Sequence, residues 1–102
     1  MATIEVEIRK TKVFAKWLDN LKDPKAKARI LIRLRRLGSG NAGDVKPVGE
    51  GLSEMRISYG PGYRVYFKGI GSKLVILLAG GKKGSQQRDI KRAISLSREL
   101  EV

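Results

Sequence analysis

The sequence predicts a small α+β fold: an antiparallel twisted β-sheet of about four to five strands packed against two N-terminal helices, with a C-terminal helix. Two patterns predict it. Both ends of the chain carry apolar residues at helical spacing, and the middle carries short segments of alternating polarity separated by turn residues. A chain of 102 residues has room for one compact domain, so residues 1–102 are expected to form a single domain.

The N-terminal region is expected to form a strand and then a helix. Apolar and charged residues alternate from Thr3 to Arg9, which is the period-two pattern of a half-buried strand. Thr11 can cap the helix that follows, because its hydroxyl can accept hydrogen bonds from the free amides of the first turn. Phe14 and Trp17 fall on the apolar face of this helix and are expected in the core.

A second helix is expected to begin at Asp23-Pro24 and to end at the Gly-Ser-Gly turn of residues 38–40. Aspartate accepts hydrogen bonds from the free amides, and proline has no amide proton to leave unpaired. One face of this helix is apolar and should be buried, comprising Ala26, Ile30, Leu34 and Leu37. A separate stripe is basic, comprising Lys25, Arg29, Arg33 and Arg36.

Further strands and a final helix are expected in the rest of the chain. The expected strands are residues 45–48, 52–58, 63–68 and 73–79, arranged as an antiparallel meander. The segment Tyr59-Gly-Pro-Gly-Tyr63 is a strong turn signal between two of them. Gly80-Gly81 is expected to break the last strand, and Ser85 to cap the final helix. The buried side of that helix is expected to comprise Ile90, Ala93, Ile94, Ser97 and Leu100.

The charge of the chain indicates a polyanion or an acidic protein as its partner. Lysine and arginine number 22 against 10 aspartates and glutamates, which gives a formal charge of +12 and attracts RNA, DNA or an acidic protein. A surface that only confers solubility is the other explanation, and an excess this large on so short a chain disfavours it. A basic ribosomal protein also fits the charge.

The residue types that are missing exclude several classes of enzyme. The chain has no cysteine and no histidine, which excludes zinc enzymes, cysteine proteases and Ser-His-Asp hydrolases. Residues 80–85 resemble a P-loop only superficially, since its first glycine and the Ser or Thr after its lysine are missing. The spacing of Asp44, Glu50, Glu54 and Asp89 does not suggest a magnesium site. We therefore expect no metal and no cofactor.

The location expected for the protein is the cytoplasm. No apolar run approaches the roughly 20 residues that a membrane span needs, so no membrane association is expected. The first ten residues alternate charged and apolar side chains, unlike a signal peptide.

Alternation along the central strands predicts a group of polar side chains on one face of the sheet. Arg56 in one strand, and Arg64 and Tyr66 in the next, should emerge together if the apolar faces pack on the helices. Lys82 and Lys83, just after the last strand, could close one side of a basic concave surface. Arginine forks onto phosphate oxygens and tyrosine can stack on a base, so this group suits an RNA backbone. Solvated residues that protect a sheet from aggregation are the alternative, which the clustering disfavours.

Other polar residues are candidate RNA contacts outside the catalytic group: Lys82, Lys68, Arg29, Arg33 and Gln86. Arg29 and Arg33 belong to the basic stripe of the second helix, and a charge run on a helix is usually a solvated face. The stripe is therefore given no catalytic role. It could be a second contact to ribosomal RNA, or the face that meets an acidic partner.

Several stretches, taken in their order and separation, carry a family resemblance. They are Phe14-Ala-Lys-Trp-Leu-Asp19, Gly43-Asp-Val-Lys-Pro-Val-Gly-Glu50, Ser53-Glu-Met-Arg56, Gly60-Pro-Gly-Tyr-Arg-Val-Tyr66 and Gly80-Gly-Lys-Lys83 ahead of Gln86 to Ile90. Together they resemble the HigB-like addiction-module killer proteins, a phage-derived group within the RelE/ParE toxin superfamily. The resemblance covers most of the chain, roughly Lys12 to Arg98.

The resemblance implies a RelE/ParE-like fold and the toxin of a type II toxin–antitoxin pair. Such a toxin cuts mRNA on the translating ribosome, arrests translation, and is neutralised in a hetero-oligomer by a cognate antitoxin, often a helix-turn-helix protein. By motif, the arginine of the Glu-x-Arg strand is Arg56 and that of the Tyr-Arg-Val strand is Arg64. Relatives commonly read Gly-Gly-Asp-Lys after the last strand, whereas here Lys82 stands in the acidic place and Lys83 holds the lysine.

Metal-independent RNA cleavage is consistent with the composition, because RNA carries its own nucleophile. A 2′-hydroxyl that attacks the adjacent phosphate needs alignment, proton transfer and neutralisation of charge, none of which demands histidine. The hypothesis is that Arg56 and Arg64 hold the scissile phosphate, Lys83 assists proton transfer or charge neutralisation, and Tyr66 positions a base or a proton. A free lysine has a pKa near 10.4, so Lys83 would need a lowered pKa to act as a base.

Two other functions fit the same sequence. A ParE-type toxin binds DNA gyrase and cuts nothing, and one fold in the superfamily serves both activities. A non-catalytic RNA-binding or ribosomal protein explains the charge without a toxin, and predicts that expression is harmless. An adjacent small reading frame for a helix-turn-helix protein would favour the toxin pair.

Overall fold

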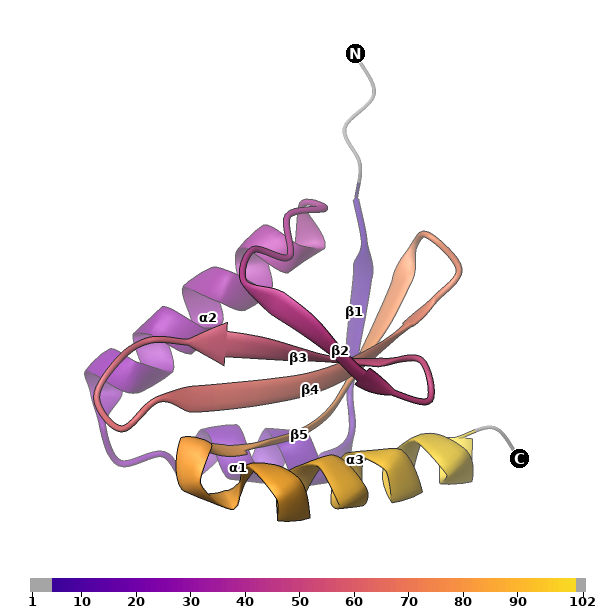
Figure 1. The fold of residues 1–102 in the computed structure, drawn as a ribbon. Helices are drawn as coiled ribbons and strands as arrows, with labels where there is room; N and C mark the ends of the chain where they lie inside the picture. Colours follow the sequence, from indigo (N-terminus) through magenta and orange to yellow (C-terminus); the bar gives the residue numbers. More distant parts are fainter. Residues whose placement is uncertain (1–4, 101–102) are drawn as a thin grey trace.

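A computed structural model describes residues 5–100 of the chain. In chain order the elements are β1 Glu7–Lys10, α1 Lys12–Asp19, α2 Pro24–Gly38, β2 Val45–Gly49, β3 Leu52–Ile57, β4 Tyr63–Ile70, β5 Leu74–Lys82, the 3₁₀ turn η1 Lys83–Ser85, and α3 Gln86–Leu100. Five strands form one sheet in the order β1-β5-β4-β3-β2 (Figure 1). The predicted α+β architecture is confirmed.

The helices lie on both faces of the sheet. In Figure 1, α1 and α2 lie behind it, and α3 runs along its lower front. One apolar cluster joins α1 and α2 to the rear face, with Phe14, Ile30 and Val65 fully buried in it. A smaller cluster joins α3 to the front face around Tyr66, Leu78 and Ala93. Each face of the sheet is therefore buried at least in part, which differs from a sheet with one solvated face.

The predicted starts of the first two helices are confirmed at atomic detail. The Thr11 hydroxyl accepts from the amide of Phe14 at 3.0 Å, which caps α1. The Asp23 carboxylate accepts from the amides of Lys25 and Ala26 at 2.9 and 3.2 Å, with Pro24 as the first residue of α2. The four apolar residues predicted for the inner face of α2 are all buried. Phe14 is buried as expected, whereas Trp17 is only half-buried.

The prediction of an entirely antiparallel sheet is wrong at its first strand. β1 pairs in parallel with β5, while the other neighbours are antiparallel. A parallel pair needs a long crossover connection. Residues 11–73, which include both N-terminal helices, provide it. β1 begins at Glu7, and the first residues of the expected strand, Thr3 and Ile4, lie outside the described residues.

The glycine pair 80–81 does not end the last strand, contrary to the prediction. β5 continues to Lys82, with Gly80 paired to Val65 and Gly81 paired to Arg64 in the ladder with β4. The missing side chains admit close neighbours instead. A Cβ on Gly80 would lie within 2.6 Å of three Trp17 ring atoms, and one on Gly81 would lie 2.8 Å from Cγ of Asp89. The glycines therefore let α1 and α3 approach the strand.

The C-terminal helix differs from its prediction at both ends. Leu100, expected on the buried side, is 49% exposed, and the buried set begins one residue earlier than predicted, at Asp89. The Ser85 hydroxyl donates to the Asp89 carboxylate, and it also lies within reach of the Lys82 carbonyl. None of the helices between residues 5 and 100 is long and apolar enough to cross a membrane.

Candidate functional site

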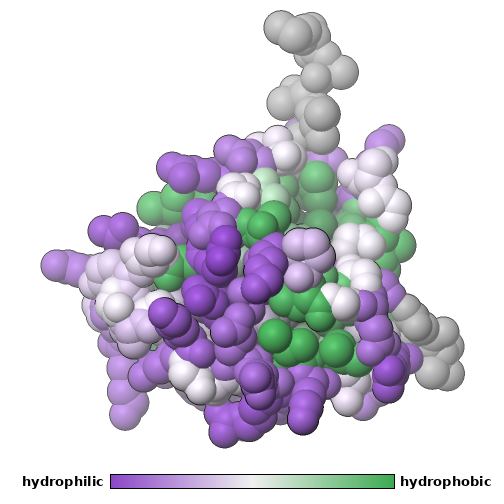
Figure 2. All heavy atoms as spheres, in the orientation of Figure 1, coloured by the Kyte–Doolittle hydropathy of each residue, from purple (hydrophilic) through white to green (hydrophobic). Residues whose placement is uncertain are grey.

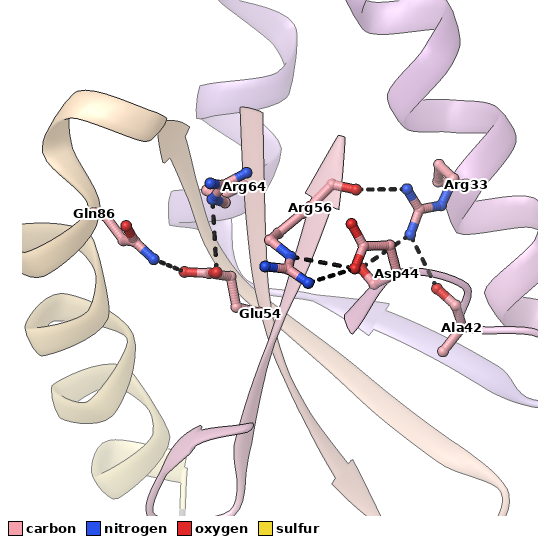
Figure 3. Close-up of polar contacts among 7 residues, drawn as sticks. All are labelled: Arg33, Ala42, Asp44, Glu54, Arg56, Arg64 and Gln86. Carbon is pink, nitrogen blue, oxygen red and sulfur yellow. Dashed lines mark hydrogen bonds and ion pairs between the residues drawn. The ribbon is translucent and has the colours of Figure 1, made fainter. Parts of the chain in front are cut away.

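The two arginines predicted for the site are direct neighbours in the sheet. Arg56 of β3 lies opposite Arg64 of β4, and Glu54 lies opposite Tyr66 two residues along. Alternation places all four on the front face. Figure 2 shows hydrophilic side chains over much of that face, with hydrophobic ones between β2 and α3. Figure 3 shows that charged groups form a row across the strands from α3 to α2.

Arg56 is held by an acidic partner, Asp44, in this row. Its Nη2 and Nε atoms lie 2.7 and 3.2 Å from Oδ1 of Asp44, and its side chain is 39% exposed. The backbone repeats the pairing, because the Arg56 amide donates to the Asp44 carbonyl at 3.0 Å. Arg56 is therefore fixed in place, and two of its donors are already used.

Arg64 is more buried than Arg56, and its donors are not committed. Only 12% of its side chain is exposed, and its Nε lies 3.6 Å from Oε1 of Glu54, too far for a hydrogen bond. No group among residues 5–100 accepts a hydrogen bond from its guanidinium. A guanidinium carries five N–H donors, so Arg64 can bind an anion without first losing a partner.

Arg64 and Lys83 line one small pocket of about 330 Å³. The remaining lining is the polar turn between β3 and β4, from Ile57 to Gly62. The ladder brings the two cations together, because Tyr63 pairs with Lys82 and the Lys83 amide donates to the Gly62 carbonyl at 3.0 Å. The pocket therefore carries two positive groups, which suits an anionic group such as a phosphate.

Arg29 lies beside this pocket, whereas Arg33 is occupied elsewhere. The Arg29 guanidinium sits over the ring of Tyr59, 4.6 Å from its centroid, and Tyr59 lines the pocket. The Arg33 guanidinium donates to the carbonyls of Arg56, Ala42 and Asp44 at 2.6, 3.1 and 3.3 Å. Its contacts join α2 to β3 and to the loop before β2, so Arg33 stabilises the backbone on both sides of the Arg56–Asp44 pair.

Arg33→Ala is expected to lower the free energy of unfolding by about 1–2 kcal/mol, because backbone carbonyls lose a charged donor. Urea denaturation would measure the change. Arg35→Ala is the matched control, since Arg35 is exposed on the same helix, and a surface change of this kind stays within about 0.5 kcal/mol. Equal stabilities of the two variants would show that the Arg33 contacts contribute nothing.

The prediction that Tyr66 emerges beside the arginines is wrong. Its side chain is fully buried, because α3 covers this end of the front face. Burial, followed by the charges of Glu54 and Asp89, raises the pKa of Tyr66 well above its usual range, so the phenol stays protonated at neutral pH. In the described structure a nucleobase of the RNA cannot stack on this buried ring. The role predicted for Tyr66 stays a prediction.

The other predicted RNA contacts are dispersed. Lys68 lies four residues from Arg64 along β4, which is about 13 Å, at the end of the strand away from the pocket. Lys82 is exposed at the end of β5 but does not line the pocket. Gln86 begins α3 and donates from Nε2 to Oε2 of Glu54 at 2.6 Å. Their predicted contacts with RNA stay predictions.

Sequence reasoning missed the acidic partners of this site. Glu54, which is 1% exposed, lies beside Arg64, and Asp44 forms an ion pair with Arg56. The available signal was the position of Glu54, which alternation places on the same face as both arginines. Within residues 5–100, no three histidine, cysteine, aspartate or glutamate side chains are grouped so that they could hold a metal ion.

The fold and this polar sheet face define a protein with the fold of RelE. The chain is similar to a solved structure of the E. coli toxin RelE, a mutant in the free state, with a TM-score of 0.69 and 16% sequence identity. The match covers 89% of this chain and 96% of RelE, which confirms the predicted RelE/ParE-like architecture.

The sequence itself places the chain in a family. It is 50% identical over 95 residues to a protein of Haemophilus influenzae strain Rd that is described as uncharacterized. The match covers 93% of this chain and 96% of that protein, so the chain belongs to the same protein family. No protein-family model matches the chain.

Proposed function

We propose that the protein is the toxin of a type II toxin–antitoxin system, a HigB-like endoribonuclease that cuts mRNA on the translating ribosome without a metal. The observation that carries this proposal is the pocket that Arg64, with its uncommitted donors, lines together with Lys83. The fold shared with RelE, which is named a toxin, supports it. The resemblance of the motifs to HigB-like killer proteins supports the particular group.

The geometry suits cleavage by the 2′-hydroxyl of the RNA. Arg64 can form paired hydrogen bonds with two phosphate oxygens, which neutralises charge as the phosphorane forms. Lys83 is exposed, lines the same pocket and can donate to the phosphate or to the leaving oxygen. Arg56, tied to Asp44 at the strand edge, can contact a neighbouring phosphate. Arg29 lies over the ring of Tyr59, which lines the pocket, and adds a further positive charge beside it.

The expected partners are the mRNA, the ribosome and a cognate antitoxin. A chain of formal charge +12 attracts both polyanions and an acidic polypeptide. An antitoxin of the helix-turn-helix type would form a hetero-oligomer with this protein in the cytoplasm. Its binding to the basic surface would prevent access to the ribosome.

Controlled expression in bacteria tests the proposal. Growth arrest, together with codon-associated cuts found by primer extension on cellular mRNA, is the expected result. Purified protein should cut a defined mRNA only in the presence of ribosomes. Intact messages with inhibited gyrase would instead establish a ParE-type activity, and harmless expression would establish a non-catalytic RNA-binding protein.

A further inference from the structure

Glu54 is a buried carboxylate at the centre of the candidate site, and the proposed chemistry gives it no contact with RNA. Its residue is 1% exposed, in the middle of β3. Burying a carboxylate is costly unless other groups compensate, and an apolar side chain of similar size is often at least as stable. A charge retained at such a position therefore calls for a reason other than packing.

The contacts of Glu54 are divided between its two oxygens (Figure 3). Oε2 accepts from Nε2 of Gln86 at 2.6 Å, so the first turn of α3 fixes one side of the carboxylate. Oε1 faces Nε of Arg64 at 3.6 Å and has no hydrogen-bond partner within residues 5–100. One oxygen of the carboxylate is thus fixed by α3, and the other lies beside the Arg64 guanidinium.

Arg64 has one acidic partner among the described residues, the carboxylate of Glu54. Its Nε is buried, and no other acidic group forms an ion pair with it among the described residues. A long side chain loses rotational freedom when it binds a ligand, and a fixed opposite charge reduces that loss. With Nε turned toward Glu54, the Nη groups are the donors left for a phosphate in the pocket that Arg64 lines.

We infer that Glu54, held by Gln86, is a positioning residue that orients the Arg64 guanidinium toward the phosphate of the RNA. The inference rests on the proposed function for its substrate. It assigns to Glu54 an effect on the rate of cleavage rather than on the binding of the ribosome. A merely structural ion pair would instead affect stability first.

The test compares Glu54→Gln with the wild-type protein. The variant keeps the shape of the side chain and removes its charge. We expect the cleavage rate on saturating programmed ribosomes to fall about 100-fold, as a small misplacement of a catalytic group does, with apparent ribosome affinity unchanged within about threefold. The melting temperature should fall, because the buried Arg64 side chain loses its opposite charge, but the variant should remain folded at the assay temperature, so that unfolding does not account for the lower rate. Glu54→Asp, which keeps the charge at a shorter reach, should recover part of the rate.

Glu7→Gln is the matched control, because Glu7 is exposed and, among residues 5–100, pairs only with Arg9. Its cleavage rate should equal that of the wild type. A Glu54→Gln variant that cleaves like the wild type, or that loses activity only in proportion to a lower melting temperature, would overturn the inference.

A spectroscopic measurement decides the inference if the wild-type protein cuts no RNA. The Arg64 Nε–H signal, assigned by its loss in Arg64→Lys, should exchange slowly with water in the wild type and at least about tenfold faster in Glu54→Gln. Inorganic phosphate should also shift this signal at lower concentration in the wild type. Equal exchange and equal phosphate response in both proteins would refute the positioning role, independently of the proposed activity.

Discussion

Arg64→Ala is expected to lower the rate of ribosome-dependent mRNA cleavage by about 100- to 1000-fold, the usual cost of one donor to a developing negative charge. Arg64 lines the pocket together with Lys83 and has no accepting partner within residues 5–100, so its hydrogen bonds are available for the phosphate. The measurement is single-turnover cleavage of a defined mRNA on programmed ribosomes. In cells, the same variant should no longer arrest growth.

The controls must separate lost chemistry from lost stability, since Arg64→Ala leaves the buried Glu54 without its cation. Arg64→Lys keeps a positive charge there but loses the planar fork, so it should remain folded and still cleave at least tenfold more slowly than the wild type. Arg98 lies near the C-terminal end of α3, is exposed and pairs with Glu50. The Arg98→Ala variant should cleave normally. Full toxicity of Arg64→Ala would remove the pocket from the mechanism.

Local signals in the sequence were sufficient to predict most elements. The caps at Thr11 and Asp23 depend on contacts within one turn, so residue type and position determine them. The hairpin of β3 and β4 follows from a glycine-rich turn between two alternating segments, and its register places Arg56 opposite Arg64. That part of the site could be predicted because it lies within one hairpin.

Features that depend on distant contacts were not predictable. The parallel pairing of β1 with β5 joins residues from opposite ends of the chain. Gly80-Gly81 has the composition of a strand end, yet ladder hydrogen bonds need no side chain, and close packing by Trp17 and Asp89 favours glycine there. Only the three-dimensional structure shows which of these competing effects prevails.

The error at Tyr66 has the same origin. Alternation correctly places Tyr66 on the face of Arg64, but it does not show how far α3 extends over that face. Nor does a count of charges show their pairing. Asp44 accepts two hydrogen bonds from Arg56, whereas Glu54 lies 3.6 Å from Nε of Arg64 without a hydrogen bond. The two cations therefore differ in the donors they can offer, although the sequence presents them as equivalent.

Gly80→Ala is expected to lower the free energy of unfolding by about 3 kcal/mol, the upper part of the range for overpacking. The added Cβ would lie within 2.6 Å of three ring atoms of Trp17, which packs against the core cluster, so the ring or the strand would have to shift. For a domain of this size the loss corresponds to a melting temperature lower by roughly 10–20 °C. Calorimetry or urea denaturation would measure it.

Gly69→Ala is the matched control, because Gly69 also lies in a strand but has no atom within 4 Å of an added Cβ. It should be neutral or slightly stabilising, by up to about 1 kcal/mol, since alanine restricts the unfolded chain. Combining Gly80→Ala with Trp17→Leu should cost less than the sum of the two single changes, because the smaller side chain relieves the clash. Additive losses, or equal stability of the Gly80 and Gly69 variants, would show that the contact between Trp17 and β5 is not what requires glycine at position 80.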